Sequence, residues 1–584
     1  MVDRWLVEVD LDDTWDFYSR ANFGEVIPDV VTPFWSWLIE WHGKPGPFEN
    51  GFRRGGIRFG TYDPAEFPPD RPIFVAVSGG YAYLNVTTGR IFGHRMPGMT
   101  PEQIDTAYFG DAPGLPEFEV QEGDDRPDLS EKMAASFGAA LTATEFPEAL
   151  ADEEMVNQLR AERPDLATLS DRELLDRALK VLDDHFENLF AQHMWSTTCV
   201  SAPVGVLGAV CAAVGRPEDT FNLMAGLGDV ASAAPSMAMW ELGRMAAESP
   251  ELGEAFDAGP VGLAGRLSAL AGNPDADLFL GAFEQFIYDY GSRGPNEWDP
   301  RCPTWETDPD LALAAIDRMR VADDDRSPID RNEERAATRR RLAAEVGAMV
   351  EDDPEAAGQF AAALGSASVW MPGRERTKTN IVKMINEARV ALYELGRRRV
   401  EEGDWQRVND FALLFRDELV EEVDKPGTHS GVLEEREALR LEVAALQEPF
   451  FIVGEHVDMS TMPRRDALVV DALVAGDSLT GVGGCPGVAR GTARVLLDSH
   501  DPAALEPGDI LVAPITDPSW TPLFVPAEGV VVDVGAPLSH AVIVSRELGI
   551  PCVVSAIDAT KKIPDGALVE VDGTTGVVTV LEAP

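Results

Sequence analysis

His540 lies in a segment whose chemistry suits a histidine that carries a phosphoryl group. An apolar strand is predicted over residues 529–534, and Ser539 follows it as the N-cap of a short helix that Gly549 and Pro551 end. His540 then takes the first helical position. There the backbone N–H groups have no partner within the helix and the helix dipole favours anions, so a phosphoryl group on the imidazole would meet hydrogen-bond donors. A histidine that only caps or packs is the alternative.

Two cations four residues apart, Arg374 and Lys378, form the second candidate group. If a helix begins this early in the chain, both side chains project from one face. Phosphoryl transfer passes through a state whose charge spreads over the equatorial oxygens, so a pair of cations can clamp the group as it moves. A solvated helix face that pairs with Glu375 is the alternative.

A loop broken by glycine and proline carries a third group, Arg293, Glu297 and Asp299. These charged side chains either hold an acceptor molecule or lock the loop through internal ion pairs. The residues alone do not separate the two interpretations.

His193 follows a long predicted helix, with Trp195 two residues on. Its imidazole titrates near neutrality and is a candidate general base on an acceptor hydroxyl, while a packed, aromatic-like side chain is the alternative. A metal site that adds His185 is less favoured, because a spacing of eight residues is not usual for ligands, so no metal ligand is assigned. Tryptophan and methionine side chains of the middle region predict an apolar pocket for an aromatic or polyketide-like acceptor, or else a plain core: Trp195, Trp240, Trp305, Trp370, Met194, Met237 and Met239.

The elements that position these residues divide the chain into several folding units, as expected for 584 residues with 45% hydrophobic content. Two predicted strands, over 73–78 and 81–86, form a hairpin around Gly79 and Gly80, and a loop rich in proline, aspartate and glycine follows over 111–127. The periodicity then becomes helical. The predicted helices are Asp171–Phe190, Pro203–Val214, Pro260–Ala271, Asp308–Arg320, Glu333–Val350, Asn380–Arg398 and Leu433–Leu446.

These patterns predict a multidomain α+β fold. A large, mainly α-helical substrate-binding domain with a small N-terminal sheet spans residues 1–455, with a mixed α/β part over 1–110 and a helical part over 129–446. A hinge linker over 456–478 leads to a compact β/α domain over 479–584.

Composition limits the classes of partner and compartment. The formal net charge of −51, from 100 acidic and 49 basic residues, argues against sequence-independent binding to nucleic acid and against binding to anionic membranes. Five scattered cysteines without a C-x-x-C pair indicate reduced thiols in a cytoplasmic protein, and the N-terminus lacks the apolar core of a secretory signal. The longest apolar run, over 200–215, is shorter than a membrane span and is predicted to be a buried helix.

Residues 481–581 resemble the swivelling phosphohistidine domain of enzymes that use phosphoenolpyruvate, including pyruvate phosphate dikinase, and of rifampicin phosphotransferase. The motifs follow in the family's order: an opening hairpin over 484–495, the segments 507–512 and 516–521, the Ser-His helix, and a closing segment over 563–573. In that family the histidine of this helix takes up phosphate. The resemblance therefore assigns this role to His540 alone. Ser539, from its position at the start of the helix, and Thr521 are expected to stabilise the phosphate.

Residues 12–455 resemble the substrate-binding domain of rifampicin phosphotransferase-like proteins. The shared motifs lie at 15–28 with 31–33, at 81–85, at 290–299 with 303–305, and at 374–378 with 394–398. The resemblance favours Arg374 and Lys378 as a phosphoryl clamp. It also places the Arg293, Glu297 and Asp299 loop, with His193 and Trp195, in the part that binds the acceptor.

The sequence contains no recognisable nucleotide-binding motif. Family members that act alone carry an ATP-grasp domain ahead of the substrate domain, but there is no G-x-x-x-x-G-K-[ST] loop here and no βα alternation of a phosphoenolpyruvate-binding barrel. We expect an arrangement similar to phenylphosphate synthase, in which a separate ATP-grasp protein supplies phosphate from ATP, with Mg²⁺ at the partner's site. The expected acceptor is a small aromatic or apolar hydroxyl compound. A condensing ligase that uses a phosphorylated intermediate and a non-catalytic binding or regulatory relative are the alternatives.

Overall fold

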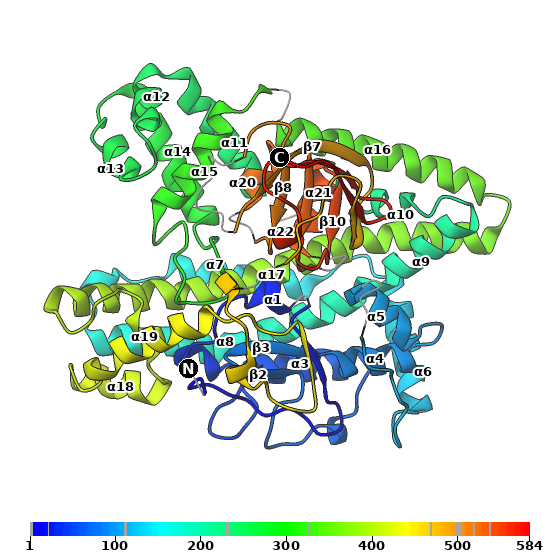
Figure 1. Ribbon diagram of the computed structural model, residues 1–584, viewed down its shortest axis with the longest axis horizontal. Helices are drawn as coiled ribbons and strands as arrows, with labels where there is room; N and C mark the ends of the chain where they lie inside the picture. The colour runs from blue at the N-terminus through cyan, green and yellow to red at the C-terminus, as the bar shows by residue number, and fades with distance from the viewer. Residues whose placement is uncertain are drawn as a thin grey trace.

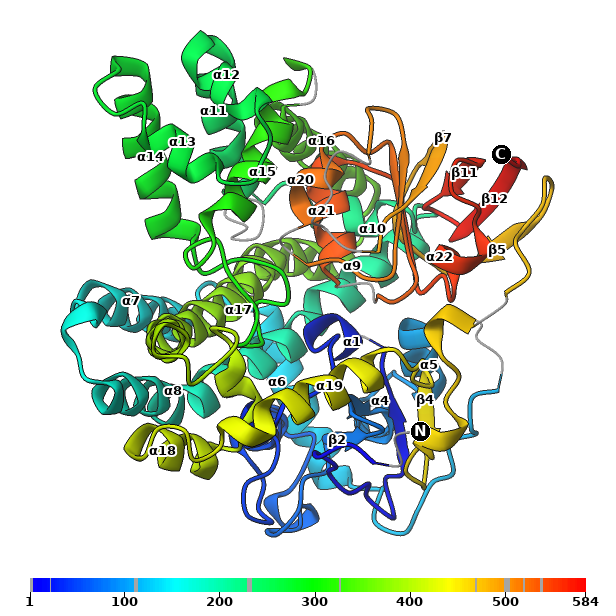
Figure 2. The same cartoon turned by 60° about the vertical axis from the view of Figure 1, so that its left-hand side comes forward.

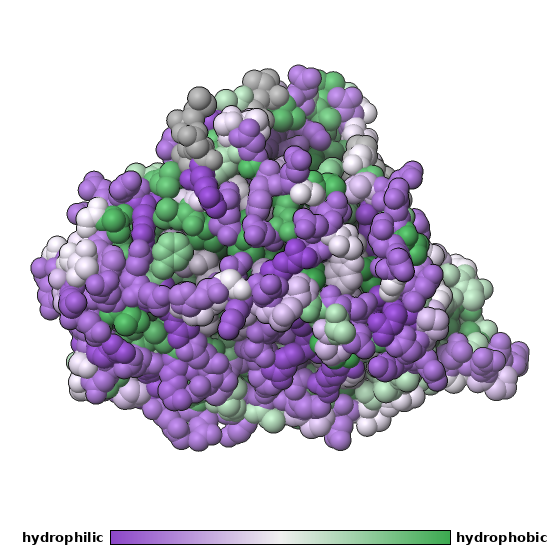
Figure 3. All heavy atoms as spheres, turned by 90° about the horizontal axis from the view of Figure 1, so that it is seen from below, coloured by the Kyte–Doolittle hydropathy of each residue, from purple (hydrophilic) through white to green (hydrophobic). Residues whose placement is uncertain are grey.

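The computed structural model describes residues 4–21, 23–109, 114–227, 234–324, 327–467, 470–497, 505–517, 520–535 and 539–584. Figure 1 shows a large helical region that carries a small sheet near the N-terminus, and a C-terminal sheet domain that lies against one side of it. This is the fold class predicted from the sequence. The surface seen from below is mainly hydrophilic, with small, scattered apolar patches, as the excess of acidic residues leads one to expect (Figure 3).

The N-terminal sheet is antiparallel and has four strands in the order β2-β3-β1-β4. Its strands are β1 (Phe17–Ser19), β2 (Val75–Ser78), β3 (Tyr81–Asn85) and β4 (Phe451–Val453). The predicted hairpin between β2 and β3 is confirmed, and both Gly79 and Gly80 adopt the positive φ that its tight turn requires. The fourth strand was not foreseen: it comes from the far end of the helical region and pairs with β1.

Short helices and turns surround this sheet. They are α1 (Phe23–Val26), α2 (Pro33–Ser36), α3 (Pro47–Phe59), η1 (Pro64–Glu66), α4 (Val86–Arg95), α5 (Pro101–Phe109), α6 (Pro127–Leu141) and α7 (Pro147–Ala161). Most of them begin with a proline in the first turn, where a missing N–H costs no intrahelical hydrogen bond.

Two long helices form the centre of the molecule, α8 (Asp171–Cys199) and α17 (Pro354–Glu402), and they pack along each other (Figure 1). The helix predicted over Asn380–Arg398 was too short, because α17 continues through Pro372 back to Pro354. Proline within a helix removes one backbone hydrogen bond, yet the helix continues there. The helix α9 (Ser201–Ala213) follows α8 directly. Together α8 and α9 are long and apolar enough to cross a membrane, a test that buried core helices also pass, and α8 packs here against α3 and α17.

The remaining helices and turns form a lobe, an arm beside the C-terminal domain, and short segments before and after the long helices and β4. They are η2 (Leu166–Thr168), α10 (Asp219–Asn222), α11 (Ala234–Glu248), α12 (Pro250–Asp257), α13 (Leu263–Ser268), α14 (Pro274–Tyr290), α15 (Pro309–Val321), α16 (Pro328–Met349), η4 (Asp410–Leu413), α18 (Arg416–Asp424), α19 (Ser430–Ala444), η5 (Met459–Thr461) and η6 (Arg465–Ala467). Helices α11 to α15 make the lobe at the upper left of Figure 1, and α16 makes the arm behind the C-terminal domain.

The C-terminal domain is an eight-stranded mixed sheet in the order β5-β12-β11-β7-β8-β9-β10-β6. Its elements are β5 (Ser478–Thr480), β6 (Val482–Cys485), β7 (Val488–Val495), β8 (Ile510–Ala513), α20 (Thr521–Phe524), β9 (Gly529–Val532), α21 (His540–Leu548), β10 (Cys552–Val554), α22 (Ala559–Lys562), β11 (Leu568–Asp572) and β12 (Val577–Glu582). Strands β7 to β10 run parallel in the middle. Figure 2 shows α20 and α21 on the side that faces the helical region.

The opening hairpin expected over 484–495 is wrong. Strand β6 pairs with β10 at one edge of the sheet, whereas β7 pairs with β8 and β11. Pro486 and Gly487 lie between the two strands, and Gly487 has a φ of 130°. They redirect the chain from one strand to a distant position in the same sheet, so the short separation in sequence does not produce a hairpin.

Candidate functional site

His540 occupies the first position of α21, directly after the N-cap Ser539, as predicted. Gly549 ends the helix in the left-handed conformation. The imidazole lies between two hydroxyls: Nδ1 is 3.1 Å from Thr516 Oγ1 and Nε2 is 3.1 Å from Thr521 Oγ1. Burial, with Lys378 and Arg293 nearby, lowers the pKa of His540 well below its usual value. The ring is therefore neutral at physiological pH, which is the form that can attack a phosphoryl donor.

Glu25, from the short helix α1, lies at the N-terminus of α21. Its Oε1 accepts a hydrogen bond of 2.5 Å from the backbone N–H of His540, so a helix of the large region closes over the histidine. The second carboxyl oxygen, Oε2, is shielded from solvent and has no hydrogen-bond partner. Burial raises the pKa of Glu25 to about 7, against the opposing effect of Lys378. The sequence reasoning did not single out Glu25.

A small cavity of about 50 Å³ separates His540 from the large region. Its lining includes Glu25, Glu297, Arg374, Lys378 and His540. Because α17 extends back to Pro354, Arg374 and Lys378 do lie one turn apart on one helix. Arg374 is largely buried and its Nη1 donates to Glu375 Oε1 at 2.5 Å. The pairing with Glu375 is the one that the alternative interpretation predicted, whereas the burial differs from that of a solvated face. Arg374 and Lys378 both line the small cavity with His540.

The three residues predicted in the loop after α14 do not share one site. Arg293 and Glu297 form a buried ion pair at 2.8 Å, so the loop is locked internally, and Glu297 Oε2 is left without a partner beside the small cavity. Asp299 lines neither the small cavity nor the larger one described below, and its carboxylate faces Arg301 at 3.5 Å.

Asp29, Asp299 and Cys302 come close enough together to suggest a metal site among the described residues. However, the guanidinium of Arg301 already lies 2.7 Å from Asp29 and balances the charge of both carboxylates. Burial raises the pKa of the Cys302 thiol, which disfavours the thiolate that a metal would need. We therefore assign no metal to these residues.

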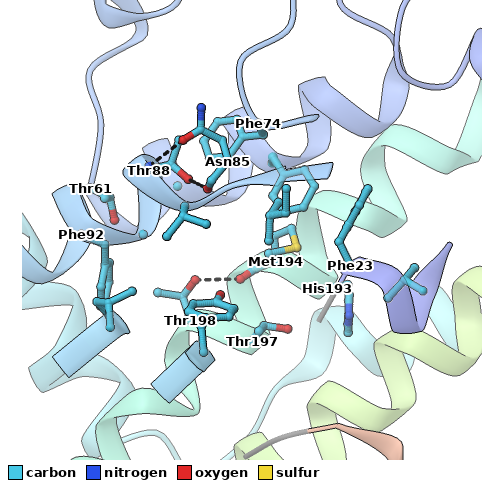
Figure 4. A pocket seen from close by; sticks show the side chains of 18 of the residues that line it. Phe23, Thr61, Phe74, Asn85, Thr88, Phe92, His193, Met194, Thr197 and Thr198 are labelled. Atoms are coloured by element: carbon cyan, nitrogen blue, oxygen red, sulfur yellow. Dashed lines mark hydrogen bonds between the residues drawn. The ribbon is translucent and has the colours of Figure 1, made fainter. Parts of the chain in front are cut away.

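A second, larger cavity of about 320 Å³ lies on the other side of the small one, between the N-terminal sheet and α8. Figure 4 shows Phe23, Phe74 and Phe92 around it, with His193, Met194, Thr197 and Thr198 of α8 along one wall. Four residues line both cavities: Val26, His193, Trp298 and Arg374. A molecule in the aromatic cavity is thus separated from His540 only by this shared wall.

His193 lies beside two buried hydroxyls. Its Nδ1 is 3.1 Å from Thr377 Oγ1, which also lies 3.0 Å from Ser196 Oγ and 2.9 Å from the carbonyl oxygen of Arg374. Burial, with Arg374 and Lys378 nearby, lowers the pKa of His193 well below its usual value, so the ring is neutral at physiological pH.

The tryptophans and methionines singled out from the sequence do not build this pocket. Of that set only Met194 lines the aromatic cavity. Trp240, Trp305 and Met239 are in the core that includes the α11–α15 lobe, and Trp195 packs against Phe59 under the guanidinium of Arg58. The cavity walls come instead from phenylalanines before residue 100, whose spacing is that of an ordinary core.

Comparison with known proteins identifies two regions. Residues 189–375 match the family described as rifampicin phosphotransferase fourth domain, and residues 505–576 match the PEP-utilising enzyme, mobile domain. The chain thus carries a region of the rifampicin phosphotransferase fourth-domain family and a mobile domain of the PEP-utilising kind. The fourth-domain match contains His193, Arg293 and Arg374, and the mobile-domain match contains Thr521 and His540. Glu25 and Lys378 lie outside both.

Several curated proteins are similar to parts of the chain. An uncharacterized protein of Mycobacterium tuberculosis is 41% identical over 211 residues, which are 36% of this chain and 23% of that protein. The rifampicin phosphotransferase of Streptomyces sviceus is 28% identical over 54% of this chain and 36% of its own length. The prodigiosin synthesizing transferase PigC of Serratia marcescens is 25% identical over 96% of this chain and 63% of its own length. The chain thus spans less than two thirds of these relatives.

Proposed function

We propose that this chain is the acceptor-binding and phosphohistidine-carrying part of a phosphotransferase, and that it moves a phosphoryl group from His540 to a hydroxyl of a small aromatic acceptor. The observation that supports this most directly is the wall shared by the two cavities. His193, the proposed general base, and Arg374, a proposed cation for the phosphoryl group, line both the cavity at His540 and the aromatic cavity.

In the proposed step the P–N bond to a ring nitrogen of His540 breaks and a P–O bond to the acceptor forms. The unprotonated ring nitrogen of His193 takes the hydroxyl proton as the oxygen attacks, and the electron pair of the P–N bond returns to the imidazole of His540. Over the full cycle that proton ends on His540, so atoms and charge balance. Lys378 and Arg374 stabilise the charge on the phosphoryl oxygens in a cavity that largely excludes water.

The source of the phosphoryl group is inferred from the sequence and not from the cavities. The sequence shows no phosphate-binding glycine loop, so we infer that ATP and its Mg²⁺ bind to a separate ATP-grasp protein, as in phenylphosphate synthase-like enzymes. The mobile domain would then carry His540 between that partner and the site described above. Such a carrier needs a tether, and we propose residues 456–478 for it. Met459 and Met462 pack in the core of the large region, and the backbone of Leu473 and Gly476 hydrogen-bonds to the C-terminal domain, so the segment passes from one part to the other.

Transfer can be tested without the partner. Phosphoramidate phosphorylates histidine directly, so it supplies phospho-His540 with no nucleotide site. The labelled protein is then mixed with a panel of hydroxyarenes, and ³¹P NMR follows the loss of acid-labile phosphohistidine and the gain of a phosphate ester. His540→Gln is the control for other labelled sites. Phosphohistidine that persists at its uncatalysed rate with every acceptor would contradict the proposal.

The match to PigC over 96% of the chain supports a second candidate, a condensing transferase that joins two substrates through a phosphorylated intermediate. Product analysis separates the two functions. A stable phosphate ester supports phosphoryl transfer, whereas release of inorganic phosphate together with a joined product supports condensation.

A further inference from the structure

The imidazole of His193 is held from across the interface between the two central helices. Its Nδ1 lies 3.1 Å from Oγ1 of Thr377, a residue of α17 whose side chain is buried at 1% exposure. This contact leaves Nε2 as the ring nitrogen for the two cavities that His193 lines. A hydroxyl on one helix thus sets the rotation of a ring on the other.

The same contact determines where the proton of the neutral ring lies. Thr377 Oγ1 also lies 2.9 Å from the carbonyl oxygen of Arg374 and 3.0 Å from Ser196 Oγ. A neutral imidazole has one N–H and one lone pair, so a hydrogen bond at Nδ1 selects one tautomer, whichever atom is the donor. Without this bond the ring could rotate about χ2 and populate both tautomers.

The hydroxyl of Thr377 does not need the histidine for its own hydrogen bonding. A threonine in a helix finds an acceptor in the carbonyl three or four residues before it, as Thr198 does with Met194 at 2.9 Å. Thr377 has this kind of bond to the carbonyl of Arg374 and in addition reaches His193 across 184 positions of sequence. The imidazole is therefore the group that gains a defined orientation from the contact.

The turn of α17 that carries Thr377 also carries the two cations of the site. Arg374 and Lys378 line the small cavity with His540, and Arg374 lines the aromatic cavity as well. Since Thr377 lies between them in one helix, a single turn sets the place of His193 relative to both cations. Such precision matters for transfer, because a misplacement of about 1 Å can cost roughly a hundredfold in rate.

We infer that Thr377 is a positioning residue, whose hydroxyl holds the imidazole of His193 so that one defined ring nitrogen faces the hydroxyl of the acceptor. The effect on transfer rests on the proposed function. The hold on the ring rests on the contacts alone.

Nitrogen-15 NMR of the unphosphorylated full chain tests the hold on the ring. The signals of His193 are identified among those of eight histidines by their loss in His193→Gln. Because burial lowers the pKa of His193, its ring is neutral at physiological pH, and a single tautomer gives one high and one low nitrogen shift. Wild type and Thr377→Ser, which keeps the hydroxyl, should show this pattern. Thr377→Val should show two intermediate shifts, as a mixture of tautomers does.

Ser366→Ala is the matched control. It removes another buried hydroxyl of α17, one that donates to the carbonyl of Ala140 at 2.9 Å, and it should leave the His193 signals unchanged. Circular dichroism of each variant confirms that the comparison is between folded proteins. If Thr377→Val does not fold, Thr377→Ala takes its place.

Transfer from phospho-His540 to phenol tests the consequence. Thr377→Val should lower the rate at saturating phenol about tenfold or more. The phenol concentration that gives half of the maximal rate should stay the same, because Thr377 lines neither cavity. Thr377→Ser should restore the rate, and Ser366→Ala should transfer as wild type does.

The inference is overturned if Thr377→Val keeps a single tautomer of His193, if it transfers phosphate as fast as wild type, or if Ser366→Ala has the same effects. If phospho-His540 of the wild-type chain does not react, the proposed transfer fails. The NMR comparison then still decides whether Thr377 holds the ring, because it needs neither phosphate nor acceptor.

Discussion

Docking of the mobile domain should depend on pH, and Glu25 is the reason. With α21 in place the pKa of Glu25 is about 7, raised from 4.5 by burial, and the ordinary value returns when α21 moves away and water reaches the carboxyl. A difference of about 2.5 units, at about 1.4 kcal/mol per unit, corresponds to at most about 3 kcal/mol. Glu547 lies at the other end of α21, where burial raises its pKa to about 7 although Gly226 and Asn332 of the large region donate hydrogen bonds to it. It adds a similar contribution to the pH dependence of docking.

The direction of this pH dependence follows from how many protons the docked and undocked states bind. Both carboxyls bind protons more tightly in the docked state, so docking takes up protons. Docking is strongest below about pH 4.5 and weakens as the pH rises to about 7, beyond which the loss is complete. Glu25→Gln keeps the hydrogen-bond acceptor for the His540 N–H without the charge. Above pH 7 it should therefore dock more tightly than wild type by up to roughly two- to three-hundredfold, and its residual pH dependence should be that of Glu547.

Energy transfer between two fluorophores measures the docked fraction. The described native cysteines are all buried, so Leu441→Cys on α19 and Val488→Cys on β7, both more than half exposed, accept the labels. The comparison runs from pH 5 to 9 for wild type, Glu25→Gln, and Glu25→Gln with Glu547→Gln. A docked fraction that stays constant with pH in wild type, or one that responds equally in the double variant, would refute the reasoning.

Three further predictions follow from the site. Lys378→Ala should lower the rate of phosphoryl transfer about a hundredfold or more, because the charge of Lys378 acts mainly in the transition state. Acceptor affinity and phosphorylation of His540 should be unchanged. Transfer at the normal rate would show that Lys378 is only a solvated surface residue. ATP labelled at the β or γ position should label His540 only when a separate ATP-binding protein is added, and label on the isolated chain would exclude the split arrangement. Limited proteolysis should cut within 456–478 and release a compact C-terminal fragment, whereas full protection of this segment would argue against a shuttling domain.

Much of the fold could be predicted because local interactions determine it. The hairpin at Gly79 and Gly80 depends on backbone conformations that glycine adopts freely, and the end of α21 depends on the left-handed conformation of Gly549. The amphipathic periodicity located the central helices, although it did not reveal that α17 runs unbroken through Pro372, since packing against α8 stabilises the helix there.

Other features of the fold and of the site depend on contacts between segments that are far apart in the sequence. Strand β4 joins the N-terminal sheet through residues such as Phe450, which accepts a hydrogen bond from Ser19 across 431 positions of sequence. Glu25 acquires its unusual pKa only because α1 closes over His540. The sequence thus determined which residues can do phosphoryl chemistry, since their types and local spacing are enough for that. Only the tertiary structure decided which of them meet and which polar atoms are left for a ligand, because burial and hydrogen-bond partners are properties of the packed chain.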